Sequence, residues 1–166
     1  MARWRPPPPR SSPYITPEGE QALNSELQEL WQLRRRDVVP ALSAAAAEGD
    51  RSENAEYIYR KKQLGEIDRR IRYLSKRLDV SEVVDRIPPQ LDKVFFGSFV
   101  TLREDNGNVV RYRIVGADEI DPALGYISVD SPMARALLGK CCNDDVQVLL
   151  PDRKAIFTVL EISYRK

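Results

Sequence analysis

Two apolar stripes of helical spacing occupy the first half of the sequence and constrain its fold more than any other feature. After Gly49, apolar residues recur at intervals of seven, three, four, three and four, the spacing of a coiled-coil seam: Tyr57, Leu64, Ile67, Ile71, Leu74 and Leu78. An approximately heptad stripe precedes Glu48 and comprises Leu23, Leu27, Leu30, Val38, Ala41 and Ala45. Because one short turn containing Gly49 joins the two stripes, the sequence predicts an antiparallel helical hairpin.

The first helix of this hairpin has a clear start and one interruption. Thr16, Pro17 and Glu18 provide a residue suited to N-capping, a proline at the first helical position and an acid in the first turn. Pro40 falls inside the same helix, where it removes a backbone hydrogen bond and crowds the preceding turn. We therefore expect Pro40 to kink the helix or to divide it.

Changes in composition divide the chain into four segments. Residues 1–13 include four consecutive prolines and little to bury, which indicates a disordered or polyproline II tail. The coiled coil is assigned to residues 14–84, and a proline-containing linker to residues 85–90. Residues 91–166 then form a second domain.

Strand patterns dominate the second domain. The segments FFGSFVTLRE and VVRYRIVG flank an Asn-Gly turn, which is a strong hairpin signal, and GYISVD indicates a third strand. The stretch SPMARALLGK predicts a short helix that Ser131 caps, with Pro132 at its first position and Gly139 near its end. VQVLL and AIFTVLEIS predict two further strands. The expected fold class is α+β, with an N-terminal helical hairpin followed by a small antiparallel sheet and one short helix.

Composition excludes several classes of function. The sequence has no histidine, so the usual general base and the commonest zinc ligand are missing. Cys141 and Cys142 are adjacent, which suits neither a disulfide between them nor a paired-cysteine zinc site. A formal net charge of +1 gives the whole chain no strong field toward nucleic acid or membrane. No apolar run could cross a bilayer and the start does not resemble a signal peptide, so we expect a cytoplasmic protein.

The predicted hairpin tip, GDRSENAEY, is rich in acids. Asp50 followed by Glu53 has the spacing of a capping box, in which both residues would start the second helix. An alternative interpretation is metal binding, because two exposed carboxylates suit Mg²⁺. Two carboxylates cannot complete its octahedral set, so such a site would function only beside ligands that a partner supplies.

The second helix becomes basic beyond the tip. Residues 53–79 contain eight basic and five acidic residues. Several of these charges have the i, i+4 spacing of ordinary surface pairs. Next to an acidic tip, however, a basic shaft could hold an anionic chain while the tip holds a cation.

The motifs together resemble the GreA/GreB family of bacterial transcription elongation and transcript cleavage factors. The resemblance covers residues 14–166 and includes GDRSENAEY, YRKKQLGEIDRRIRYLSKRL, KVFFGSFV, RYRIVGADEI and ISVDSPMARALLGK in order. It implies a C-terminal domain similar to FKBP and a coiled coil that enters the secondary channel of a backtracked RNA polymerase. It also implies stimulation of the polymerase's own RNA cleavage through a second, shared Mg²⁺, so that the factor is not itself an enzyme.

The resemblance also implies roles for individual residues. Asp50 and Glu53 match the catalytic and metal-holding acids of the tip, and Ser52 and Asn54 match residues that shape the turn. Asp130, Ser131 and Pro132 match a loop that docks on the polymerase rim. The basic residues that would bind the 3′ segment of the backtracked nascent RNA are Arg60, Lys61, Lys62, Arg69, Arg70 and Arg72. We expect a monomer with no membrane partner.

Three other functions remain open. A related factor could bind the secondary channel and regulate or inhibit the polymerase without cleavage. The C-terminal domain alone is compatible with a peptidyl-prolyl isomerase or chaperone, although a fold does not fix a function. The hairpin could also be a purely structural scaffold.

Overall fold

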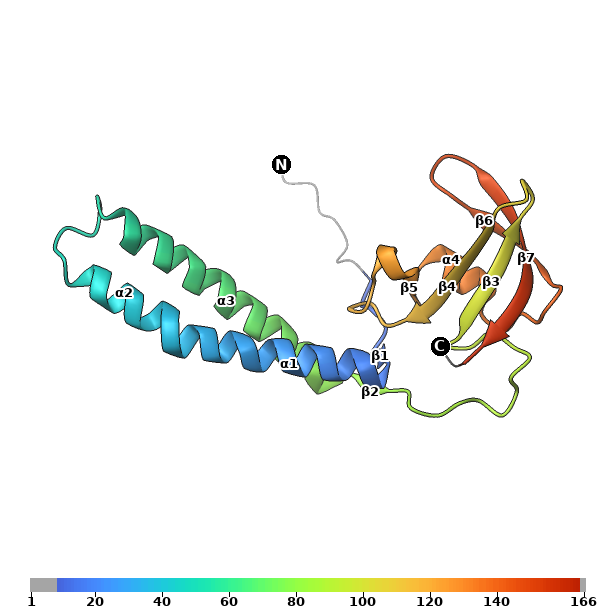
Figure 1. Cartoon of the computed structure of the whole chain (residues 1–166), viewed down its shortest axis with the longest axis horizontal. Helices are drawn as coiled ribbons and strands as arrows, with labels where there is room; N and C mark the ends of the chain where they lie inside the picture. The colour runs from blue at the N-terminus through green and yellow to red at the C-terminus, as the bar shows by residue number, and fades with distance from the viewer. Residues whose placement is uncertain (1–8, 165–166) are drawn as a thin grey trace, which may run out of the picture. The chain divides into compact units, whose positions relative to one another are not determined.

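The computed structural model describes residues 9–164 and contains two compact units. One unit is a helical hairpin of residues 20–81. The other combines residues 9–19 with residues 82–164 and is built around a sheet (Figure 1). The predicted α+β class is confirmed. Residues 1–8 of the predicted tail lie outside the described part of the chain.

The first long helix is divided where the sequence predicted an interruption. Helix α1 spans Pro17–Leu33, a π-helical turn η1 spans Arg34–Val38, and helix α2 spans Val39–Ala46. The N–H of Val39 donates to the carbonyl of Arg34, five residues earlier, as in a π turn. Pro40 follows directly and cannot donate to the carbonyl four residues before it. The π turn therefore lies next to the position at which Pro40 interrupts the α-helical hydrogen-bond pattern.

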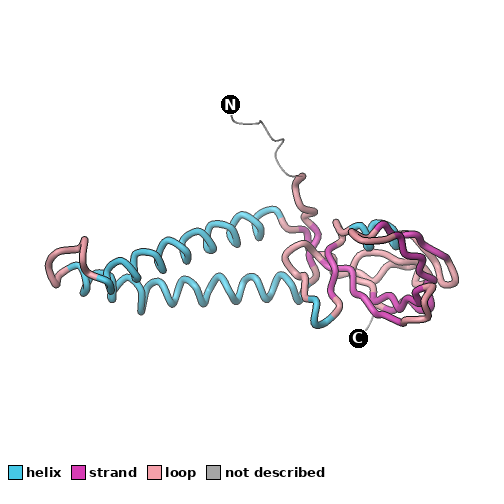
Figure 2. The backbone as a smooth tube through the Cα atoms, turned by 90° about the horizontal axis from the view of Figure 1, so that it is seen from above, coloured by secondary structure: helices cyan, strands magenta, loops and turns pink. Residues whose placement is uncertain are grey.

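The second helix of the hairpin, α3, spans Ala55–Val80 and runs antiparallel to the first (Figure 2). Its predicted apolar stripe is confirmed, because Ile67 and Ile71 are buried against Val38. Leu27, Leu30 and Leu64 pack around this cluster. Ion pairs flank the seam at the surface, between Arg34 and Asp68 at 2.8 Å and between Arg70 and Glu26 at 2.6 Å. Such exposed pairs contribute about 0–1 kcal/mol each to folding stability. The burial of apolar side chains therefore contributes more to the stability of the hairpin than these ion pairs do.

A carboxylate holds the start of α1 in the sheet-containing unit. Thr16 N–H and its hydroxyl both donate to Glu119, and Gly116 N–H donates to the same carboxylate at 2.7 Å. The Thr16 hydroxyl oxygen in turn accepts from Gly19 N–H at 3.1 Å. A Cβ on Gly19 would collide with the Glu119 side chain. A side chain at this position would therefore displace Glu119 from its hydrogen bonds to Thr16 and Gly116.

The second unit contains two sheets. Strands β1 (Tyr14–Ile15) and β2 (Glu82–Val83) form a short parallel pair. The larger sheet has the order β5-β4-β3-β7-β6. Its strands are β3 (Phe99–Glu104), β4 (Val109–Val115), β5 (Tyr126–Ser128), β6 (Asp145–Leu149) and β7 (Lys154–Ser163). The Asn106-Gly107 turn joins β3 to β4 in antiparallel pairing, as predicted.

One strand differs from the prediction. Strand β5 pairs parallel to β4, so the sheet is mixed instead of wholly antiparallel. After β4 the chain passes through a 3-10 turn, η2 (Pro122–Leu124), before it re-enters the sheet at its edge. This connection is long enough to return the chain in the same direction, whereas a tight hairpin would reverse it.

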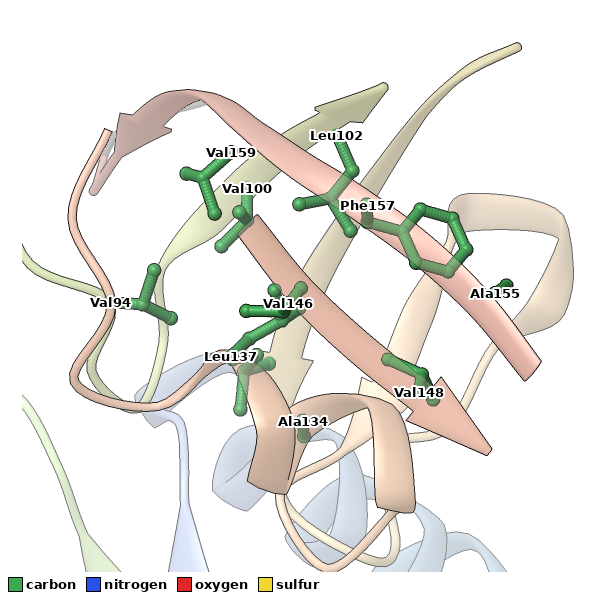
Figure 3. Packing of buried hydrophobic residues seen from close by; sticks show 11 residues of the cluster. Val94, Val100, Leu102, Ala134, Leu137, Val146, Val148, Ala155, Phe157 and Val159 are labelled. Atoms are coloured by element: carbon green, nitrogen blue, oxygen red, sulfur yellow. The ribbon is translucent and has the colours of Figure 1, made fainter. Parts of the chain in front are cut away.

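The core of this unit lies between the sheet and helix α4 (Pro132–Leu137). Figure 3 shows Ala134 and Leu137 of α4 near Val146 and Val148 of β6. The start of α4 is as predicted: Ser131 Oγ accepts from Ala134 N–H at 3.1 Å, and Pro132 occupies the first turn. Among the described residues, we find no helix with the length and apolar character to cross a membrane.

Removal of seam volume should destabilise the hairpin. We expect Ile71→Ala to cost about 2–5 kcal/mol, because it leaves a cavity in a buried cluster. The exposed Val80 supplies a control, since Val80→Ala should change stability by less than about 0.5 kcal/mol. Denaturant unfolding followed by helical circular dichroism measures both. Equal midpoints for the two variants would contradict the proposed importance of the seam.

Two glycines inside helices should respond to alanine with opposite signs. Gly65→Ala meets nothing within 4 Å and should stabilise the chain by about 0.5–1 kcal/mol through helix propensity alone. Gly19→Ala should lower the unfolding midpoint, because Glu119 must move and break its hydrogen bonds to Thr16 and Gly116. Thermal unfolding of the two variants in parallel tests this. A gain for both would show that the Glu119 contact does not constrain Gly19.

Candidate functional site

The hairpin ends in a loop of residues 47–54, here called the tip loop, between α2 and α3 (Figure 2). Gly49 adopts a positive φ of 122°, which lets the chain reverse. Asp50 is exposed, and its Oδ1 accepts from Ser52 N–H at 2.9 Å and from Ser52 Oγ at 2.8 Å. The Ser52 N–H, followed by its hydroxyl, lowers the pKa of Asp50 below its ordinary value. These hydrogen bonds therefore orient the carboxylate and favour its ionised form.

Asn54, and not Asp50, caps helix α3. Asn54 Oδ1 accepts from Tyr57 N–H at 3.0 Å, and Asn54 Nδ2 donates to the carbonyl of Ala45 at 2.8 Å. The predicted capping box of Asp50 and Glu53 is therefore wrong. Both amide atoms of Asn54 find a partner, one on each side of the turn, which no carboxylate could provide. The expectation that Ser52 and Asn54 shape the turn is confirmed.

This assignment leaves both acids available for another role. Glu53 is exposed and precedes the capping residue. Carboxylate oxygens are the ligands that Mg²⁺ prefers, so their chemistry suits that ion. Within residues 9–164, however, no three acids, cysteines or histidines are grouped to hold a metal. Asp50 and Glu53 can therefore contribute only part of an octahedral set.

The six predicted RNA-binding cations differ in their local surroundings. Lys61, Lys62 and Arg69 line a single open groove beside α3. Arg60 is engaged by Glu56 at 2.7 Å and by Gln63 at 3.0 Å.

The remaining two of these cations also lie apart from that groove. Arg70 pairs with Glu26 of α1 through two hydrogen bonds. Arg72 lies in a separate groove with Trp31 and Lys76. The six cations thus lie in four local environments with different partners.

Arg51 was not predicted as a functional residue but lies in the same groove as Lys61, Lys62 and Arg69. Its guanidinium lies over the Tyr57 ring at 5.6 Å from the centroid, and the Lys61 ammonium lies 6.0 Å from the same centroid. The i, i+4 spacing of Tyr57 and Lys61 is visible in the sequence. The position of Arg51 depends on the tip loop, where no periodicity applies.

The predicted docking residues lie together at the start of α4 in the sheet-containing unit. Ser131 caps this helix and Pro132 follows it. Asp130 is half-buried, and its Oδ2 accepts from the N–H of Ser12 at 2.8 Å. The Asp130 N–H donates to Ser128 Oγ at 3.1 Å. Hydrogen bonds at both its side chain and its backbone N–H therefore position Asp130.

Comparison with known proteins identifies the family. Residues 13–83 match the family described as transcription elongation factor, N-terminal, and residues 88–164 match the family described as transcription elongation factor, GreA/GreB, C-term. A transcription elongation factor GreB of Xanthomonas axonopodis pv. citri is 58% identical over 165 residues, covering 99% of this chain and 98% of the relative. GreB of Pseudomonas aeruginosa is 52% identical over 164 residues, with 99% and 98% covered.

Solved structures with similarity to the chain include the GreA factor homolog 1 protein of Thermus thermophilus. It is 22% identical with a TM-score of 0.43, and the match covers 93% of this chain and 99% of that one. The sequence matches span both units of the described chain and nearly the whole length of the relatives. The chain therefore belongs to the GreA/GreB family of transcription elongation factors.

Proposed function

We propose that this chain is a GreB-type factor that inserts its helical hairpin into the secondary channel of bacterial RNA polymerase and stimulates cleavage of backtracked nascent RNA. The observation that carries this proposal is the tip loop, where Asp50 and Glu53 are exposed and neither caps a helix. The reaction takes place in the polymerase active centre, and the factor supplies side chains to it. Cleavage gives a new RNA 3′ end that can be extended.

In this proposal, Asp50 and Glu53 each supply one carboxylate to the shared site. Ser52 fixes the Asp50 carboxylate and favours its ionised form, so it can serve as a ready anionic ligand. Glu53 adds a second carboxylate three residues along the same loop. A second Mg²⁺, held jointly with polymerase residues, would supply activation of water and stabilisation of charge in phosphoryl transfer. The absence of histidine from the sequence suits this mechanism, because the factor contributes no base of its own.

Docking is assigned to Asp130, Ser131 and Pro132. The first turn of α4 presents them, and backbone and side-chain hydrogen bonds fix Asp130. Docking at the polymerase rim would fix the factor from outside the channel. In this division of roles, the loop before α4 provides affinity and the tip loop provides chemistry.

Neutralisation of the tip acids should separate binding from cleavage. We expect Asp50→Asn or Glu53→Gln to reduce stimulated cleavage about 100-fold or more, as for loss of an essential charged group, with polymerase binding nearly unchanged. Release of short fragments from a stalled, backtracked complex with labelled RNA measures the rate. Glu48→Gln is the matched control, since Glu48 is an exposed acid next to Gly49.

Normal cleavage by Asp50→Asn and Glu53→Gln would disprove the metal role. If the wild-type chain binds polymerase but releases no fragments, the chain is a non-cleaving regulator of the secondary channel.

The ionisation of Asp50 should depend on Ser52. The Ser52 hydrogen bonds lower the pKa of Asp50, so the carboxylate stays charged to lower pH than an ordinary aspartate. Ser52→Ala removes the hydroxyl and should raise this pKa, so that Asp50 protonates at higher pH in the variant. An NMR titration of the Asp50 side chain in the free protein measures both values. An unchanged or lower pKa in Ser52→Ala would contradict the contact.

Disruption of the docking loop should weaken affinity without altering chemistry. Asp130→Asn halves the acceptor capacity beside Ser12 and removes the charge, and we expect it to raise the factor concentration needed for half-maximal cleavage. The rate at saturating factor should match that of the wild type. Titration of the factor against backtracked complexes separates the two quantities. A lower saturating rate at unchanged half-maximal concentration would place Asp130 in the chemical step instead.

A further inference from the structure

The N-terminal segment, residues 1–13, reaches the docking loop of Asp130, Ser131 and Pro132 through its last residues. Asp130 Oδ2 accepts a hydrogen bond from the backbone N–H of Ser12 at 2.8 Å, across 118 residues of sequence. Both residues are half-buried and belong to the sheet-containing unit. The carboxylate that the proposed function assigns to docking is therefore in contact with the segment that leads to the N-terminus.

Strand β2 holds the end of this segment in place. The Pro13 carbonyl accepts from Glu82 N–H at 2.9 Å, and Tyr14 pairs with Glu82 in the parallel ladder of β1 and β2. The Tyr14 ring also lies 6.0 Å from the ring of Phe96, centroid to centroid. Ser12 directly precedes this anchored stretch, so the fold itself presents its N–H to the docking loop.

The contact orients Asp130 without occupying it fully. An ionised carboxylate has about four acceptor positions, and the Ser12 N–H uses one of them, on Oδ2. The Asp130 N–H is also bound, to Ser128 Oγ at 3.1 Å, so backbone and side chain are both constrained. The remaining acceptor positions can receive a donor from a partner while Ser12 stays bound. The geometry therefore suits positioning of Asp130 and not its blockage.

The sequence ahead of Ser12 carries one sign of charge. Residues 1–11 contain Arg3, Arg5 and Arg10 and no acid. Of these arginines, only Arg10 lies within the described residues, where it is exposed and no carboxylate pairs with it. Because Arg10 is two residues from Ser12, their Cα atoms lie at most about 7 Å apart. The segment therefore brings a cation to the docking loop.

Trp4 adds a large aromatic side chain to these charges. Tryptophan and arginine are enriched among the residues that carry most of the binding energy of protein–protein interfaces. The four prolines between Trp4 and Arg10 have fixed φ angles, so the segment loses less backbone entropy when it binds. A cationic segment with one tryptophan, attached next to a loop that docks on a protein, fits an acidic protein surface.

We propose that the N-terminal segment is the second element of the docking surface. Ser12 orients the Asp130 carboxylate toward the partner, and the arginines that precede Ser12 bind an acidic face of the same partner protein. This inference rests on the proposed function for the identity of that partner, RNA polymerase. The contact between Ser12 and Asp130 is itself a property of the free chain.

A proline at position 12 tests the positioning role, because it removes the N–H that Asp130 accepts. The full-length chain, labelled with a fluorophore at its C-terminus, is titrated with core RNA polymerase that carries no nucleic acid, and its anisotropy gives the affinity. We expect Ser12→Pro to weaken binding about threefold, in the range of one exposed charged contact. Ser12→Ala removes only the hydroxyl, keeps the N–H and should bind as the wild type does.

A double-mutant cycle shows whether Ser12 acts through Asp130. In the Asp130→Ala background the acceptor is gone, so Ser12→Pro should cause no further loss of affinity. A variant that merely disturbed the fold would weaken binding in both backgrounds. An equal loss in the two backgrounds would therefore overturn the positioning role of Ser12.

Charge reversal tests the acidic face of the partner. We expect Arg10→Glu to weaken binding about tenfold, since attraction becomes repulsion, and Arg10→Lys to restore most of the affinity. This loss should shrink at higher salt, because exposed charges are screened. Arg103→Glu is the matched control: it reverses an exposed arginine on strand β3 and should bind as the wild type does. Equal affinities for wild type, Arg10→Glu and a chain without residues 2–10 would overturn the proposal.

The same titrations distinguish failure of this inference from failure of the proposed function. If the segment variants bind core polymerase normally while Asp130→Asn binds weakly, the segment is a passive extension and the proposed function stands. If the variants lose affinity only for polymerase that carries DNA and RNA, the segment contacts nucleic acid and the inference is wrong. A wild-type chain that does not bind polymerase at all would overturn both.

Discussion

The buried seam between the two helices of the hairpin fixes the positions on which the site depends. Val38, Ile67 and Ile71 exclude water along the contact and set which face of α3 turns inward. Asn54 then closes the open end by binding Ala45 on one helix and capping the other. Since the seam determines the register, and Asn54 can bridge only at that register, the conformation of the tip loop follows from apolar packing some distance away.

The distribution of charged residues along the chain is more informative about binding than the net charge. The chain is nearly neutral, yet Glu48, Asp50 and Glu53 lie in the tip loop, and the open groove beside it is lined by Arg51, Lys61, Lys62 and Arg69. Other charges on α3 are paired, as Arg60 is with Glu56.

Local rules predicted much of this molecule from its sequence, and the failures have identifiable causes. The helical seam, the Asn106-Gly107 hairpin and the Ser131-Pro132 helix start follow from short-range patterns that tertiary structure did not override. Asp50 and Asn54 are both good capping residues, and only the bond of Asn54 to Ala45 distinguishes them.

The remaining differences depend on contacts between distant parts of the chain. The parallel pairing of β5 depends on the path of a loop, and the separate environments of Arg60, Arg70 and Arg72 depend on partners on α1 or on the same helix. Arg51 carries no sequence pattern that would place it beside Tyr57.

The π turn before Pro40 changes the spacing of the apolar residues along the seam. Val38 follows Leu30 at a step of eight residues, one more than the seven of a heptad, and the π turn of Arg34–Val38 accommodates that extra residue. The hairpin thus contains the equivalent of a one-residue insertion, and the helix after it, α2, still contacts α3. A deletion within this turn could restore a regular helix, whereas a deletion elsewhere in α1 or α2 would turn the apolar stripe away from α3.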